Sequence, residues 1–145
     1  MHSSIFVFTH SDGYKFDEVE IYDLLHECIL CDYVREIPNN SEEYESNLND
    51  LDNYYENSCR KGNLFVNSDE NRDDFMEQKR ERIEDFMDKG LKYFKEHLGE
   101  LKEIVEEDKG FYVVLDGNLY TLDGFITDRV NLGTYEINQI FDYHA

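Results

Sequence analysis

The fold class of this chain is decided by the stretch FYVVLDGNLYTL, residues 111–122. Aromatic and β-branched residues flank Asp116-Gly117, a dipeptide that tolerates the positive φ angles of a type I′ turn, so the stretch predicts a β-hairpin. A second Asp-Gly pair, at residues 123–124, precedes another apolar segment, residues 125–130. We therefore expect a C-terminal antiparallel three-stranded meander.

The segment before the hairpin has helical periodicity instead. Residues 69–107 carry apolar side chains at heptad spacing, and Ser68 is a suitable N-cap. Gly90 and Gly99 each weaken a helix by about 1 kcal/mol relative to alanine, so a break at either would divide one long central helix into two. The heptad spacing also permits a homodimer, although Arg80 at a seam position disfavours a long coiled coil.

The two ends of the chain complete the predicted fold. Residues 4–9 form a continuous β-branched and aromatic run, which predicts a buried central strand. Thr134 is expected to cap a terminal helix. The inward face of that helix is expected to carry Ile137, Ile140, Phe141 and His144. This order of elements predicts an α+β fold in a single domain, residues 1–145.

Two acidic amphipathic helices are predicted between the first strand and the long helix. The first is expected over residues 17–36, because Asp17 and Glu20 match a capping box and Pro38 disfavours helix before it. The second is expected over residues 41–57, where five asparagines lower helix propensity and leave ordering on binding as an alternative. The predicted buried stripes are Ile21, Leu24, Leu25, Cys28, Ile29 and Tyr33 in the first helix, and Tyr44, Leu48, Leu51 and Tyr55 in the second.

Negative charge is concentrated in these two helices. Residues 17–56 hold thirteen carboxylates and one base, Arg35, a local charge of −12 out of −20 for the chain. One interpretation is a solubilising or halophile-like composition. However, crowding like charges onto a folded surface opposes folding, and the uneven distribution favours a recognition surface for a basic partner. The residues predicted to contact it are Glu20, Asp23, Glu27, Glu42, Glu43, Glu45, Asp50, Asp52, Tyr54 and Glu56. Little contribution is expected from Glu81 or Glu84 on the long helix.

The spacing of these carboxylates is compatible with that of nucleic-acid phosphates. Carboxylates at i,i+4 on a helix lie ~6 Å apart, and phosphates on one DNA strand recur at about 3.4 Å of axial rise. In size, charge and patterning the chain resembles two groups of proteins. The first is the phage or mobile-element DNA mimics, such as anti-CRISPR and anti-restriction proteins, and the second is the acidic immunity proteins or antitoxins that neutralise nuclease toxins. Either resemblance implies an inhibitor and not an enzyme.

Other classes of function have weaker support in the sequence. Cys28 and Cys31 with Cys59 are candidates for a zinc-binding domain or a small metal-dependent enzyme, although a helical position favours core packing of Cys28. No nucleotide-binding or hydrolase motif occurs, so no cofactor is expected. The absence of a basic patch argues against direct binding of nucleic acid. No apolar run approaches a membrane span, and the lack of a signal peptide with an odd number of cysteines predicts a cytoplasmic protein.

Overall fold

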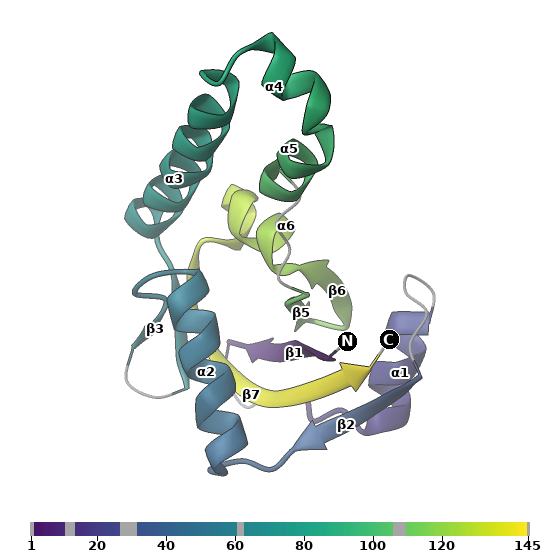
Figure 1. Cartoon of the computed structure of the whole chain (residues 1–145). Coiled ribbons are helices and arrows are strands. Elements are labelled where there is room, and N and C mark those ends of the chain that lie inside the picture. The colour runs from purple at the N-terminus through teal and green to yellow at the C-terminus, as the bar shows by residue number, and fades with distance from the viewer. Residues whose placement is uncertain (1, 11–13, 27–31, 61–62, 106–109, 145) are drawn as a thin grey trace.

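The chain has a mixed α+β fold, as predicted. A computed structural model describes residues 2–10, 14–26, 32–60, 63–105 and 110–144. Seven strands form one sheet in the order β3-β4-β7-β1-β5-β6, with β2 also paired to β7 (Figure 1). The strands are β1 (His2–Thr9), β2 (Tyr33–Ile37), β3 (Cys59–Arg60), β4 (Leu64–Asn67), β5 (Tyr112–Leu115), β6 (Asn118–Thr121) and β7 (Gly133–His144). The helices are α1 (Glu18–His26), α2 (Glu42–Tyr54), α3 (Asp69–Met87), α4 (Leu91–Glu96), α5 (Leu98–Val105), α6 (Leu122–Thr127) and the 3-10 turn η1 (Arg129–Asn131).

The first strand lies at the centre of the sheet, which confirms the prediction for residues 4–9. β1 pairs in parallel with β5 and antiparallel with β7. Because successive side chains of a strand point to opposite faces, Phe6 and Phe8 lie on one face of the sheet and Ile5 and Val7 on the other. Continuous apolar sequence is therefore required here, since both faces are covered.

Helices α1 and α2 cover opposite faces of this sheet. Ile21 and Leu25 of α1 pack in the cluster that contains Ile5 and Val7. The α2 stripe packs in the cluster that contains Phe6. That stripe consists of Tyr44, Leu48 and Leu51, continued by Tyr55, as predicted. The two acidic helices are thus separated by the thickness of the sheet (Figure 1).

The terminal helix prediction was wrong, because residues 133–144 form the long strand β7. This strand pairs with β1 along one edge and with β4 and β2 along the other. The register with β1 shifts between Val7 and Phe8, so that β7 contains one extra residue there. The shift moves Ile140 onto the same face as Ile137. A bulged strand can therefore show the three-residue apolar step that is typical of a helix.

The meander prediction was correct for its hairpin and wrong for its third strand. Asp116 and Gly117 have φ angles of 53° and 77°, as a type I′ turn requires, and join β5 to β6. Residues 122–127 instead form α6, whose N-cap Thr121 accepts a hydrogen bond from the Gly124 N–H. Leu122, Phe125 and Ile126 of α6 are all buried, an i, i+3, i+4 pattern that indicates helix.

The first acidic helix is shorter than predicted. Its capping box is present, since Asp17 and Glu20 each accept a hydrogen bond from the other's backbone N–H. Helix α1 ends at His26, and residues 33–37 form strand β2 along β7. Tertiary pairing with β7 overrides the helical pattern there, and the β-branched Val34 and Ile37 suit a strand. Residues 27–31, with Glu27, Cys28 and Cys31, lie outside the described part of the chain.

The predicted central helix is broken twice. Ser68 caps α3 as expected, but the helix ends before Gly90, whose φ of 93° few other residues adopt. A second break at His97 separates α4 from α5, which folds back along α3 (Figure 1). Phe86 packs against Tyr93 and Phe94. Apolar side chains at heptad spacing therefore contact one another within a single chain. None of the helices that the structure describes is long and apolar enough to cross a membrane.

Candidate protein-binding cleft

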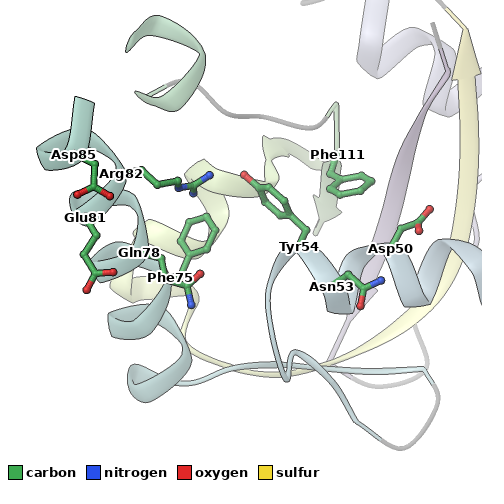
Figure 2. Close-up of a pocket in the computed structure, with 9 residues that line it drawn as sticks. All are labelled: Asp50, Asn53, Tyr54, Phe75, Gln78, Glu81, Arg82, Asp85 and Phe111. Atoms are coloured by element: carbon green, nitrogen blue, oxygen red, sulfur yellow. The ribbon is translucent and has the colours of Figure 1, made fainter. Parts of the chain in front are cut away.

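A cleft with a volume of about 680 Å³ separates the C-terminal end of α2 from α3 (Figure 2). Helix α2 contributes one wall, α3 the opposite wall, and the residue before β5 closes one side. The lining residues are Asp50, Asn53, Tyr54, Phe75, Gln78, Glu81, Arg82, Asp85 and Phe111. Each wall is anchored in the same aromatic core, because Tyr44 and Leu51 of α2 and Phe75 of α3 are buried in one cluster.

Three aromatic rings form the floor of the cleft. The Tyr54 ring lies edge-to-face with Phe75 at a centroid distance of 5.7 Å and with Phe111 at 5.6 Å. Edge-to-face pairs of this kind are favourable and hold their rings in place. Phe75 is buried, whereas Tyr54 and Phe111 are half-buried and leave part of their ring surface open to the cleft.

The hydroxyl of Tyr54 is fixed from behind. It donates a hydrogen bond of 2.6 Å to the Asp123 carboxylate. The same carboxylate lies 2.5 Å from the Lys79 ammonium of α3, and both side chains are mostly buried. Asp123 thereby joins α2, α3 and α6. The aromatic floor is therefore positioned by a charged network that spans three helices.

Carboxylates dominate the rim of the cleft. Asp50 lies on the α2 wall, and Glu81 and Asp85, four residues apart, lie on the α3 wall. One base, Arg82, lines the same cleft and extends from α3 toward Tyr54 (Figure 2). Three acids against one base in a concave, partly apolar site favour cationic ligands, because low-dielectric walls focus the field.

A second cavity extends the cleft along α2. Its volume is about 580 Å³, and it shares Asp50 and Phe111 with the first cavity. Its other lining residues are Ser3, Ser4, Arg35, Glu43, Asn47 and Asp142. Arg35 lies 2.5 Å from Glu43 and 3.5 Å from Asp142. The two cavities together, called the α2 groove below, run along one flank of the helix.

The predicted contact residues of α2 divide between its two flanks. Glu43 and Asp50, seven residues apart, line the α2 groove. Residues seven apart share a helix face, so Glu45 and Asp52 also lie together. Each follows Glu43 or Asp50 by two residues, which places this second pair on the opposite flank of α2. Glu42 is exposed at the first turn, and Glu56 is exposed beyond the end of α2. Tyr54 belongs to the floor of the groove.

The remaining predicted residues do not join this surface. Glu20 belongs to the cap of α1 and also accepts hydrogen bonds from the Tyr14 hydroxyl at 2.9 and 3.0 Å. This contact and the negative charge of Glu20 raise the pKa of Tyr14. Asp23 is exposed on α1, on the opposite face of the sheet from α2. The structure therefore does not bring the carboxylates of α1 and α2 together.

Asp52 has a structural contact. Its carboxylate accepts a 2.9 Å hydrogen bond from the backbone N–H of Cys59, which fixes the start of β3.

Burial raises the pKa of the Cys59 thiol to about 11. A thiol that stays protonated is a poor metal ligand. Within the described ranges, no group of three or more His, Cys, Asp or Glu side chains is arranged to hold a metal ion.

We expect Cys59 to alkylate slowly in the folded protein. With a pKa of about 11 in place of 9.0, the thiolate fraction near pH 8 falls by about a hundredfold. The measurement is the rate of iodoacetamide modification in a C28S/C31S variant, with and without urea. Because folding keeps the thiol protonated, stability is also expected to fall as pH rises above the unfolded pKa. Equal rates in both states would contradict this environment.

Sequence reasoning missed the α3 wall of the groove. The helical pattern of residues 69–107 places Phe75 on the apolar face, and its mixed charge is typical of an ordinary solvated helix face, with little contribution expected from Glu81. It does not predict that Phe75, Gln78, Glu81, Arg82 and Asp85 line a cleft. Phe111 was read as part of a strand, whereas it precedes β5 and closes the cleft. No local pattern distinguishes these residues, because the site exists only where three distant segments meet.

Comparison of the chain with protein-family models, with curated proteins and with solved structures found no match.

Proposed function

We propose that this protein is an acidic inhibitor that binds the nucleic-acid-binding surface of a basic protein. The observation that carries the proposal is α2, whose thirteen residues include five carboxylates and no base. This helix is packed on the sheet by Tyr44, Leu48 and Leu51, so its charges are held on a folded scaffold. Fixed negative charge of this density attracts a basic surface over a long range and increases the association rate.

The contact is assigned to the α2 side of the molecule. The carboxylates of α1 lie on the opposite face of the sheet, and one rigid partner surface contacts one face at a time. The proposed contact residues are Glu42, Glu43, Glu45, Asp50, Tyr54 and Glu56, with Asp52 supporting the fold beside them. In the DNA-mimic form of the proposal, these carboxylates take the positions of phosphates in the partner's groove, and the protein acts in the cytoplasm without catalysis.

The α2 groove favours a second candidate, an immunity protein or antitoxin specific for one nuclease toxin. A DNA mimic needs rows of charge and little else, whereas an open cleft with an aromatic floor favours recognition of one shape. The two candidates differ in breadth. A DNA mimic is expected to bind several unrelated nucleic-acid-binding proteins, and an immunity protein is expected to bind one toxin encoded beside it.

Charge reversal on α2 tests the proposal. The probe is a basic partner captured from host lysate and then purified. We expect E42K/E45K/D50K to weaken its binding by about a hundredfold, since each charge reversal replaces an attraction with a repulsion. Binding is also expected to fall steeply between about 50 and 500 mM salt. The measurement is titration of the purified partner, with duplex DNA as competitor.

The matched control is D23K/E96K/E136K, which changes the net charge equally at exposed positions outside α2. Its affinity is expected to stay within about threefold of the original. Equal losses in the two variants would mean that only total charge matters, which would contradict the assignment to α2. A partner that binds independently of salt, or that duplex DNA does not displace, would contradict inhibition at a nucleic-acid-binding surface.

A further inference from the structure

We infer that the α2 groove binds an extended, arginine-bearing peptide segment of the partner. This inference rests on the proposed function and makes it specific, because it names a flexible basic loop or tail as the part of the partner that enters the protein.

The groove has the size and continuity of a ligand site. Its two cavities, of about 680 and 580 Å³, each fall within the range of about 300–1,000 Å³ that is typical of binding pockets. They meet at Asp50 and Phe111, which line both. Two adjacent clefts on one flank of a helix suit an extended chain, because successive side chains of such a chain can enter them.

The charge of the groove selects a basic occupant. Its acids, five in number, outnumber its two arginines. The acids are Glu43, Asp50, Glu81, Asp85 and Asp142. Arg35 is already held by Glu43 and Asp142 at the far end of the groove. The side chains of Asp50, Glu81 and Asp85, which line the first cavity, are exposed.

The aromatic floor favours arginine over lysine. The half-buried rings of Tyr54 and Phe111 border the same space as the carboxylate of Asp50 (Figure 2). A guanidinium group can stack on a ring and bind a carboxylate in the same position, whereas an ammonium group is a strongly hydrated point charge. Lys79 already lies 5.2 Å from the centre of the Phe75 ring at the back of the floor, so this part of the protein accommodates a cation against an aromatic face.

Arg82 provides a specific signature for this site. It extends into the first cavity, where an incoming arginine would meet a like charge (Figure 2). Removing it should therefore strengthen binding of a cationic peptide. Arg80, two residues away on α3, contacts Glu77 and Glu84 outside the groove. R82A and R80A change the net charge of the same helix equally, but Arg82 lines the groove whereas Arg80 does not.

The test uses a fluorescently labelled peptide of alternating arginine and glycine, titrated into the full-length protein at about 150 mM salt. We expect D50N/E81Q to weaken binding about tenfold, and E70Q/E84Q, which changes the net charge equally at exposed positions of α3 outside the groove, to change it less than about twofold. We expect R82A to tighten binding about threefold or more, and R80A to leave it within about twofold. A lysine-glycine peptide is expected to bind more weakly than the arginine peptide.

Mapping by amide chemical-shift perturbation locates the bound peptide. Shifts concentrated at Asn53, Tyr54, Gln78 and Phe111 are the expected result. Shifts spread over all acidic surfaces, or equal effects of the matched variants, would overturn the inference by showing nonspecific attraction to a chain of charge −20.

Failure of the inference and failure of the proposed function are distinguishable. If the peptide ignores the groove while E42K/E45K/D50K still releases a DNA-binding partner, the groove inference is wrong and the proposed function stands. If the peptide binds the groove but duplex DNA displaces no partner, the site is real and the inhibitor function is wrong.

Discussion

Replacing Phe8 with alanine is expected to lower the free energy of unfolding by about 3–5 kcal/mol. Phe8 is 1% exposed and lies at the centre of an aromatic cluster. Its ring centroid is 4.6 Å from that of Phe65, 5.4 Å from Phe125 and 5.6 Å from Tyr135. Alanine would leave a cavity that these rings cannot collapse to fill, because each is held by a different element of the fold.

The measurement is equilibrium unfolding in urea, and the control is V130A. Val130 is 86% exposed, so its truncation is expected to change stability by less than about 0.5 kcal/mol. A loss below about 1 kcal/mol for F8A would mean that the aromatic cluster does not form the core of the protein.

Replacing Asn67 with alanine is expected to destabilise the protein by about 2–4 kcal/mol. The Asn67 side chain, 1% exposed, accepts a 2.9 Å hydrogen bond from the Tyr55 hydroxyl and donates one of 3.0 Å to the Asn131 carbonyl. Alanine would remove the acceptor of the buried Tyr55 hydroxyl, whereas the Asn131 carbonyl would keep its 2.8 Å hydrogen bond from the Tyr135 hydroxyl. The contact connects the segment after α2 to η1 through β4.

A double-mutant cycle with Y55F separates the hydrogen bond from the loss of side-chain volume. Y55F removes the donor as well as its need for a partner, so the double variant is expected to be more stable than the sum of the single losses by about 1 kcal/mol. N63A is the control, because Asn63 is exposed and immediately precedes β4, the strand that contains Asn67. Strict additivity would contradict the proposed role of this bond.

The features that could be predicted from sequence are those determined locally. Ser41 and Ser68 cap their helices with their own side chains, and the Asp116-Gly117 turn is determined by two residues. The β1 prediction also succeeded, because a strand buried on both faces needs an unbroken apolar run. In each case the sequence within a few residues contains the physical cause.

The predictions that were wrong concern features that depend on residues distant in the sequence. β2 is the next described element after α1, and it becomes a strand because β7 supplies an edge about a hundred residues later in the chain. The pattern of β7 is obscured by its bulge, which places Ile137 and Ile140 on one face. The predicted site failed in part for the same reason. Charge density identified α2 correctly as exposed and acidic, but no sequence pattern shows that α3 and Phe111 lie opposite Asp50.

The position of β7 has a consequence for synthesis on the ribosome. This strand follows β1, β2 and β4 in the sequence, yet all three hydrogen-bond to it. These three strands therefore each have an unpaired edge until residues 133–144 leave the exit tunnel. Non-local pairing of this kind slows folding and exposes strand edges in the meantime. The nascent chain is thus expected to need its high charge, or a chaperone, to stay unaggregated until β7 has emerged.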